Sequence, residues 1–492
     1  MSMIKVENLT FAYPDSYDNV FENVSFQIDT DWKLGFIGRN GRGKTTFLKL
    51  LLGNLEYNGK IYTSIDFDYF PYPVEDKERM TYEILNEVCS QAEDWEIIRE
   101  ISYIGVDAEA LYRPFNLLSN GEQTKVLLAS LFLNEGKFLL IDEPTNHLDT
   151  TARDMVADYL NKKKGFILVS HDRSFLDRCV DHILAVNRCN IEVQNGNYST
   201  WKENFDRQQQ SELSKNEQLH KDIARLQEAS RRSAIWADKV EKSKKGTTNS
   251  GSKLDKGFVG HKSAKMMKRS KGFETRRQQE IDKKSELLKN VEWNESLKIQ
   301  SLKHHSRNLV EFNDVSVVYD ERIICKNINF TVQQGERVVL EGGNGSGKSS
   351  LLKLMLGTEI SHTGSIHLSS GLIISYVQQD TSDLHGSLSD YAQSYSIDET
   401  LFKSILRKMD FERVQFEKDI SDYSGGQKKK VLIARSLCEK AHLYVWDEPL
   451  NFIDVYSRIQ IEELIKKFEP TMIFVEHDRT FQQEIATKKI VL

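Results

Sequence analysis

The sequence predicts an α/β protein in which two similar domains follow one another and are joined by a long α-helical hairpin. The first observation is a repeat, because the second half of the chain carries the motifs of the first half in the same order. The second is that short apolar runs alternate with helical patterns in each half, which is typical of a largely parallel sheet. The third is an amphipathic, charge-rich connector. We place the domains at 1–198 and 306–492, with the connector at 199–305.

Four landmarks support a duplicated domain, and each recurs 304 to 306 residues later in the chain. They are a glycine-rich loop at 38–45 and 342–349, a serine-glycine loop at 119–123 and 424–427, Asp-Glu-Pro at 142–144 and 447–449, and His-Asp-Arg at 171–173 and 477–479. Because the order is kept and the offset is nearly constant, coincidence is excluded.

Composition limits the class of protein. Of 492 residues, 39% are hydrophobic and 28% are charged, which is enough for sizeable cores in two or three domains. No apolar run reaches the roughly 18 residues that a membrane helix requires, and the N-terminus has no secretory pattern. The five cysteines are odd in number and scattered, so we expect a reducing, cytoplasmic location.

The connector has the pattern of two helices with a turn between them. Residues 201–242 contain no Gly or Pro, and apolar residues such as Leu219 and Ile223 follow helical spacing. A second stretch, which is Pro-free and nearly Gly-free, runs over 263–291, and the glycine-rich segment 246–260 separates the two. About forty helical residues would project ~60 Å. A flexible linker is the alternative, but such linkers are not amphipathic.

Positive charge is concentrated at the end of this hairpin, at about 240–270. Residues 239–271 hold eleven Lys or Arg and two acidic residues, although the net charge of the chain is −6. One basic segment on an acidic protein suggests a polyanionic partner, and a solvated loop is the alternative. The candidate RNA-contact residues are Lys244, Lys245, Lys253, Lys256, Phe258, Lys262 and Lys265. Phe258 could instead fold back to seal the two helices.

Both glycine-rich loops have the pattern GxxxxGK[ST], follow an apolar strand and open a helix. Such a loop closes its backbone N–H groups around phosphates at a helix N-terminus. We expect Lys44 and Lys348 to reach the phosphates, and the hydroxyls of Thr45 and Ser349 to hold Mg²⁺. The candidate nucleotide-binding residues of the loops are Gly38, Asn40, Gly41, Gly43, Lys44, Thr45, Thr46, Gly342, Asn344, Gly345, Gly347, Lys348, Ser349 and Ser350.

The two Asp-Glu pairs stand where apolar strands end. There Asp142 and Asp447 can fix Mg²⁺, directly or through water, and Glu143 and Glu448 can orient and deprotonate the attacking water. A surface pair is the alternative, but four apolar residues precede each pair, and this edge of a sheet is where ligands bind.

The serine-glycine loops resemble the signature motif of the ATP-binding-cassette family. The resembling residues are Ser119, Asn120, Gly121, Glu122, Ser424, Gly425, Gly426 and Gln427, with Asp149 and Asp454 further along. The resemblance implies two tandem ATP-binding-cassette domains of the P-loop NTPase fold, paired head to tail. One ATP would lie between the Lys44 loop and Ser424, and the other between the Lys348 loop and Ser119.

The resemblance also assigns two aromatic and two histidine residues. Tyr13 and Tyr319 match the aromatic that stacks on adenine, and strand packing is the alternative. His171 and His477 match the switch that contacts the γ-phosphate, although a single histidine is more often structural.

Two departures from the family pattern predict unequal sites. Gln379 matches a glutamine that helps to coordinate Mg²⁺, but Tyr72 stands at the corresponding place in the first domain and has no amide oxygen. Asn120 stands where glycine is usual, so its side chain weakens close backbone approach.

Fusion of two cassettes in one chain resembles the F subfamily, of which DEPTNHLD (142–149) and GFILVSHDR (165–173) are typical. The stretches 31–48, 446–451 and 488–492 resemble its Lsa-type antibiotic-resistance branch.

The resemblance implies a ribosome-associated ATPase that binds the tRNA exit site in its ATP-bound, closed form. The hairpin would dislodge lincosamides, pleuromutilins or streptogramin A from the peptidyl-transferase centre, and ATP hydrolysis would release the protein. The implied partners are large-subunit rRNA and neighbouring tRNA, without a membrane partner, and the chain would act as a monomer. A housekeeping translation factor is one alternative, although it would usually carry an extra arm in the first domain. A nucleic-acid-remodelling ATPase is the other.

Overall fold

The structure is a computed structural model of the 492-residue chain. It describes residues 2–14, 19–134, 136–146, 148–187, 190–208, 297–319, 322–411 and 413–492, together with helical pieces of one or two residues between 210 and 232. The predicted basic tip at 240–270 lies outside the described residues. Met1–Trp201 and Glu295–Leu492 form one compact unit, and Lys202–Asn294 form a second. The two predicted domains thus share a unit, and their boundaries stay a prediction.

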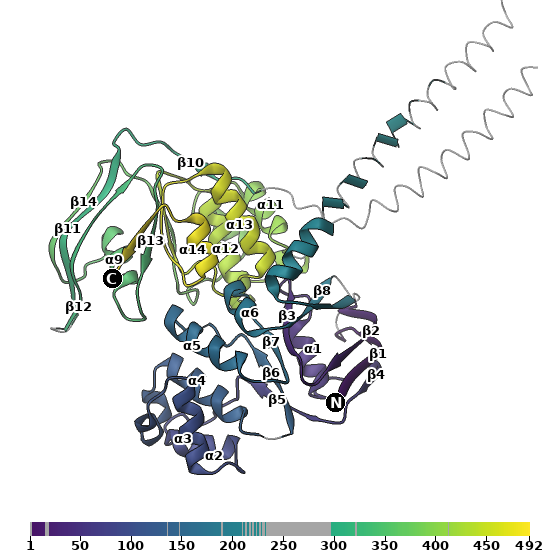
Figure 1. The fold of residues 1–492 in the computed structure, drawn as a ribbon. Coiled ribbons are helices and arrows are strands. Elements are labelled where there is room, and N and C mark those ends of the chain that lie inside the picture. The colour runs from purple at the N-terminus through teal and green to yellow at the C-terminus, as the bar shows by residue number, and fades with distance from the viewer. Residues whose placement is uncertain are drawn as a thin grey trace, which may run out of the picture. The chain divides into compact units, whose positions relative to one another are not determined.

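Each half is built on a mainly parallel central sheet, as the apolar runs predict (Figure 1). In the first half the strand order is β5 (Asp66–Phe70), β6 (Lys137–Asp142), β7 (Phe166–Val169), β3 (Lys33–Gly38), β8 (His182–Asn187) and β9 (Asn190–Asn195), with only β9 antiparallel to its neighbour. In the second half the order is β15 (Ile374–Val377), β17 (Leu443–Asp447), β18 (Met472–Val475), β13 (Arg337–Glu341) and β19 (Lys488–Val491), all parallel. The shared order confirms the duplication.

A three-stranded antiparallel sheet accompanies each central sheet. These are β2 (Phe21–Asp29), β1 (Met3–Phe11) and β4 (Asn58–Tyr62) in the first half, and β12 (Arg322–Gln333), β11 (Asn308–Tyr319) and β14 (His362–Leu368) in the second. The short strands β10 (Gln300–Ser301) and β16 (Lys440–Ala441) pair in parallel where the connector returns.

The helices repeat in the same way. The first half has α1 (Lys44–Leu51), α2 (Thr81–Val88), α3 (Asp94–Tyr103), α4 (Asn120–Leu131), α5 (Thr150–Asn161) and α6 (Arg173–Cys179). The second has α9 (Lys348–Met355), α10 (Leu388–Ser394), α11 (Glu399–Lys408), α12 (Gly425–Cys438), α13 (Val455–Phe468) and α14 (Arg479–Ile485). In the first half, α2, α3 and α4 lie at the opposite end from β1, β2 and β4 (Figure 1).

Local sequence places the site at the ends of these elements. The strands β7 and β18 are buried at every position, because both of their faces are covered. Polar loops follow both strands, so each apolar run ends where its strand ends. The helices α4 and α12 begin with capping boxes, in which Ser119 pairs with Glu122 and Ser424 with Gln427. The signature motifs therefore lie at helix N-termini.

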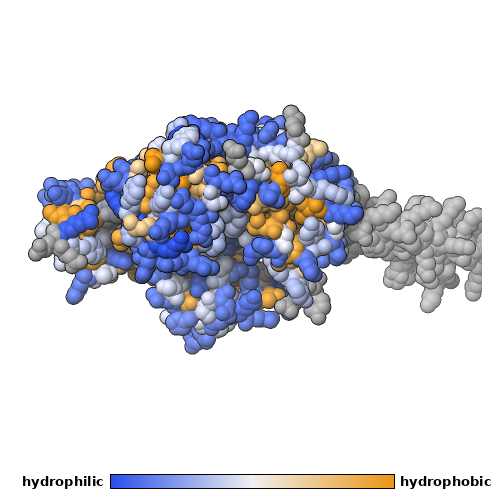
Figure 2. Space-filling model, turned by 90° about the horizontal axis from the view of Figure 1, so that it is seen from below, coloured by the Kyte–Doolittle hydropathy of each residue, from blue (hydrophilic) through white to orange (hydrophobic). Residues whose placement is uncertain are grey.

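The hydrophilic surface and the short helices agree with a charge-rich sequence that has no long apolar run. The face in Figure 2 is largely hydrophilic, with apolar side chains in separate patches. Within the described part of the chain, no helix combines the length and apolar character needed to cross a membrane.

Candidate functional site: two composite ATP sites

The two glycine-rich loops have nearly the same conformation. Gly43 and Gly347 are left-handed, with φ of 88° and 94°, and each immediately precedes its helix. A Cβ atom on Gly43 would overlap Val20, so this position requires glycine. The amine of Lys44 donates to the carbonyl of Gly38 at 2.8 Å, and Lys348 makes the matching bond to Gly342 at 2.9 Å. The loops thus have the geometry that a phosphate site requires.

The Lys348 loop faces the first signature motif across a cavity of about 890 Å³. Residues of both halves line this cavity, among them Ser119, Asn120, Gly121, Glu122, Tyr319, Asn344, Gly345, Gly347, Lys348, Ser349, Ser350, Gln379, Glu448 and His477. The backbone N–H of Asn344 also donates to Asp149 of the first half, at 3.4 Å. These contacts place the loop of one half beside the signature of the other.

The Lys44 loop meets the second half in the reciprocal way. The side-chain amide of Asn40 donates to the carbonyl of Phe452 at 2.7 Å. A Cβ atom on Gly426 would come within 3.0 Å of Asn40 Nδ2, so the second signature lies directly against this loop. Gly425 packs near the ring of Phe452. The structure therefore arranges both sites head to tail, as the family resemblance implies.

In the first half, Asp142 lies where a metal ligand is expected. Thr45 Oγ1 donates to Asp142 Oδ2 at 2.9 Å, and burial raises the pKa of this carboxyl. The hydroxyl of Tyr69 also donates to Oδ2, at 3.2 Å. Tyr69 is a residue that the sequence analysis missed, although Tyr376 repeats it in the second half. Tyr72 lies near Glu87 instead, and its pKa is raised by burial and by the charge of that carboxylate. The tyrosine that contacts the acidic pair is therefore Tyr69.

The predicted base of the first half, Glu143, is buried with little polar support. Burial and the neighbouring Asp142 raise its pKa to about 8. His171 Nε2 lies 3.3 Å from Glu143 Oε1, but this approach lacks hydrogen-bond geometry, and Oε1 has no hydrogen-bond partner among the described residues. Burial also lowers the pKa of His171 well below its usual value, so this imidazole is neutral.

The predicted base of the second half, Glu448, is held firmly. Gln379 Nε2 and Asn451 Nδ2 both donate to Glu448 Oε2, at 2.8 and 2.6 Å. Burial opposes ionisation, but His477, whose Nε2 lies 3.5 Å from Oε1, and the hydrogen bond from Gln379 outweigh it and lower the pKa of Glu448. The amide of Gln379 therefore contacts the base, and its predicted role as a metal ligand stays a prediction.

Asp447, beside this base, has the properties of a cation ligand. Burial raises its pKa to about 6, and Oδ1 is buried without a hydrogen-bond partner among the described residues. Ser349 lowers the pKa of Asp447 by a hydrogen bond, so a hydroxyl and a carboxylate lie together. Oxygen donors of this kind suit Mg²⁺, which completes its shell with water and phosphate oxygens. The residues present therefore fit the expected metal.

Both predicted adenine-stacking tyrosines have partly exposed rings. Tyr13 is 43% exposed and its hydroxyl bonds Thr46 at 2.8 Å. Tyr319 is 42% exposed and bonds Ser350 at 3.2 Å. Each ring thus lies beside the start of the helix that follows the phosphate loop, where a base could stack.

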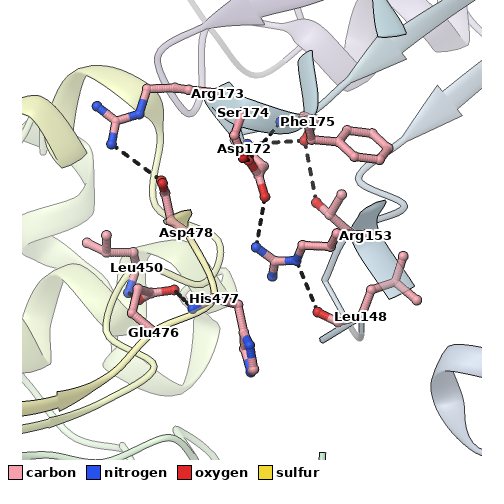
Figure 3. Close-up of polar contacts among 12 residues, drawn as sticks. Leu148, Arg153, Asp172, Arg173, Ser174, Phe175, Leu450, Glu476, His477 and Asp478 are labelled. Atoms are coloured by element: carbon pink, nitrogen blue, oxygen red, sulfur yellow. Dashed lines mark hydrogen bonds and ion pairs between the residues drawn. The ribbon is translucent and has the colours of Figure 1, made fainter. Parts of the chain in front are cut away.

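Charged residues that follow the two switch histidines join the halves (Figure 3). Arg153 binds Asp172 at 2.9 Å within the first half, and Arg458 binds Asp478 at 3.0 Å within the second. Arg173 crosses between the halves and donates to Asp478, at 3.4 Å. None of these arginines is assigned a role in the sequence motifs, because their partners lie 19 or more residues away in the chain.

Comparison with known proteins agrees with this geometry. A family model described as ABC transporter matches residues 21–146 and 325–451, just over half of the chain. The chain is 27% identical over 503 residues to the ribosome protection protein VmlR of Bacillus subtilis (strain 168), across 100% of this chain and 86% of the relative. It is 26% identical over 490 residues to the ATP-binding protein Uup of Caulobacter vibrioides, across 97% of this chain and 75% of the relative.

Solved structures share the fold. The archaeal ribosome recycling factor aABCE1, solved in complex with the ribosomal stalk protein aP1, matches with a TM-score of 0.63 at 19% identity, over 98% of this chain and 87% of that chain. The RNase-L inhibitor gives a TM-score of 0.61 at 19% identity, over 99% and 87%. At these identities the likeness concerns the fold alone, which is that of two tandem P-loop NTPase domains.

Paired phosphate loops, Asp-Glu pairs and signature helices, with each site drawing on both halves, define a two-site ATPase. Since the family model matches in both halves, the chain belongs to the ATP-binding-cassette family described as ABC transporter, and it hydrolyses ATP. Similarity along the whole chain to VmlR and Uup supports its assignment to the F subfamily.

Proposed function

We propose that this protein binds the ribosome in its ATP-bound form and dislodges antibiotics from the peptidyl-transferase centre. The observation that carries the proposal is the head-to-tail arrangement, because each nucleotide site then depends on residues of both cassettes. Similarity over the whole chain to a protein named as a ribosome protection protein supports the choice of partner.

ATP is the substrate and also the ligand that favours the closed arrangement. At one site it is bound by the Lys348 loop and the Ser119 signature, and at the other by the Lys44 loop and the Ser424 signature. A nucleotide that contacts both cassettes stabilises their closed state by its differential affinity for that state. Tyr13 and Tyr319, the adenine-side aromatics, complete the sites.

Hydrolysis is the step that ends this closed state. Glu143 and Glu448 take the proton of the attacking water, and His171 and His477 contact the γ-phosphate. Thr45, Asp142, Ser349 and Asp447 would hold Mg²⁺, with Gln379 as a further candidate. When bound there, the ion would supply neutralisation of the charge that develops on the phosphate oxygens. Loss of the γ-phosphate removes contacts that only the closed state makes, so the cassettes separate and the protein leaves the ribosome.

The hairpin tip is proposed to act on the ribosome itself. Lys244, Lys245, Lys253, Lys256, Lys262 and Lys265 would neutralise phosphates of large-subunit rRNA, and Phe258 would stack on an exposed base. These residues lie outside the described part of the chain, so their role rests on the sequence alone. Lincosamides, pleuromutilins and streptogramin A are the drugs that the Lsa-type resemblance implies.

A housekeeping translation factor is the second candidate. Its support is that Uup, whose name records only ATP binding, is nearly as similar to this chain as VmlR is. The two candidates differ in whether the protein changes drug susceptibility.

The test is expression in a bacterium that is sensitive to all three drug classes. The proposal predicts growth at higher drug concentrations than with an empty vector, and no protection by a Lys44→Ala, Lys348→Ala control expressed to the same level. Unchanged susceptibility, with the protein present on ribosomes, would contradict antibiotic protection and favour the housekeeping role.

A further inference from the structure

Lys429 is a buried lysine that the ATP-site motifs do not use. It lies in the second turn of α12, only 2% exposed, and its Nζ donates to the main-chain carbonyl of Gln378 at 2.9 Å. The negative charges of Asp447 and Glu448 favour the charged form of Lys429, which offsets part of the free-energy cost of burying an ammonium group.

The carbonyl that Lys429 holds belongs to the segment that positions the predicted base. Gln378 follows directly after β15, and Gln379 comes next in the chain. Gln379 Nε2 then donates to Glu448 Oε2 at 2.8 Å. A short chain of contacts therefore runs from α12, through the backbone at Gln378, to the carboxylate of Glu448.

The first cassette lacks both parts of this connection. The residue corresponding to Lys429 is Thr124, whose hydroxyl donates within its own helix to the carbonyl of Asn120 at 2.9 Å. The residue corresponding to Gln379 is Tyr72, which does not offer an amide. The repeat thus supplies an internal comparison, with the connection present in one cassette only.

We propose that Lys429 is a positioning residue for hydrolysis at the Lys348 site, where it fixes the segment that places Gln379 against Glu448. The helix that carries Lys429 starts at the signature Ser424, and Gly426 lies beside Asn40 of the other phosphate loop. The base of one site is therefore tied to the helix that closes the other site. This inference goes beyond the proposed function and rests on the proposed role of Glu448.

The test uses the full chain with Glu143→Gln, so that turnover reports the Lys348 site. Lys429→Met keeps the length of the side chain and removes the donor. We expect kcat to fall by about 10- to 100-fold, because small displacements of catalytic groups have effects of this size. The KM for ATP should stay unchanged, since Lys429 is not among the described residues that line the cavity.

A double-mutant cycle with Gln379→Ala separates positioning from general damage. If Lys429 acts through Gln379, the double variant loses no more kcat than Gln379→Ala alone. An unchanged kcat in Lys429→Met, a loss confined to KM, or losses that multiply in the double variant would each overturn the inference. If Lys429→Met does not fold, Lys429→Thr, which introduces the residue of the first cassette, tests the same inference by the same kcat measurement.

Two further variants complete the design. The matched control is Thr124→Met in a Glu448→Gln chain, in which turnover reports the Lys44 site. This change should leave kcat unchanged. A loss of kcat equal to that of Lys429→Met would count against the inference. Adding Glu448→Gln to the Glu143→Gln chain tests the base itself. If that change costs nothing, the proposed role of Glu448 is wrong, which is distinguishable from a failure of Lys429 alone.

Discussion

Arg173 of the first cassette forms a buried ion pair with Glu462 of the second, in which Nη1 lies 3.0 Å from Oε2. The same guanidinium donates to Asp478. Arg173 stands two residues after His171, and Asp478 directly follows His477. The switch loops of the two ATP sites are therefore joined by one largely buried charge network.

Replacing Arg173 tests this network against its counterpart. Arg479 makes the reciprocal contact with Asp154, but both side chains are substantially exposed. Arg173→Met leaves the buried carboxylate of Glu462 without its ion-pair partner and should lower the free energy of unfolding by about 3–5 kcal/mol. Arg479→Met should cost less than about 1 kcal/mol. Urea unfolding of the two variants measures the difference, and equal losses would show that burial does not set the strength of these contacts.

Acid should weaken the same network. Burial raises the pKa of Asp478, but the charges of Arg173 and Arg458 lower it by more than burial raises it. The net pKa is therefore below the ordinary aspartate value. Because the folded-state pKa is the lower one, ionised Asp478 stabilises the fold above about pH 4, and this contribution disappears as the pH falls through the folded pKa. Urea unfolding at a series of pH values should show a shallower acid loss in Asp478→Asn than in the unsubstituted chain. Parallel curves would assign the acid sensitivity to other carboxylates.

The two ATP sites should contribute unequally to turnover. Glu448 Oε2 receives two hydrogen bonds, whereas Glu143 Oε1 has no hydrogen-bond partner among the described residues. A base that is already oriented favours hydrolysis at the Lys348 site. Steady-state ATPase should therefore fall more in Glu448→Gln than in Glu143→Gln. The reverse ranking, or equal losses, would mean that these hydrogen bonds do not decide the rates.

The hairpin tip should carry protection without carrying ATPase. Replacing Gly246–Gly260 with a short Gly-Ser turn should leave ATP hydrolysis intact and abolish drug protection. Neutralising several of the tip lysines should also flatten the salt dependence of ribosome binding, by roughly 0.7–0.9 of a log unit per lost phosphate contact. A shortened protein that still protects cells would reduce the tip to a connector.

Much of the fold follows from the sequence because its signals are local. The strand residues 138–141 and 443–446 form continuous apolar runs and lie in β6 and β17, as predicted. The two phosphate loops open α1 and α9, again as predicted, because glycine spacing and the following helix are encoded within a few residues.

The parts of the site that the sequence does not predict depend on contacts between residues that are distant in the chain. Arg173 and Glu462 are 289 residues apart, and nothing near either one identifies its partner. Lys429 stands in a run of three lysines, a pattern typical of a solvated surface, yet burial makes it a structural donor. Tyr69 could have been found, since it lies 73 residues before Asp142 and Tyr376 lies 71 residues before Asp447.

Ribosome binding in the ATP state is the central claim, and co-sedimentation with purified ribosomes tests it most directly. The Glu143→Gln, Glu448→Gln double variant keeps the shape of both sites but lacks the bases, whose removal typically costs roughly 10²–10⁴-fold in rate. ATP should then bind and hold the cassettes closed. We predict more ribosome-bound double variant with ATP than with ADP, and more than for the unsubstituted chain. Equal or weaker co-sedimentation of the double variant would contradict the account.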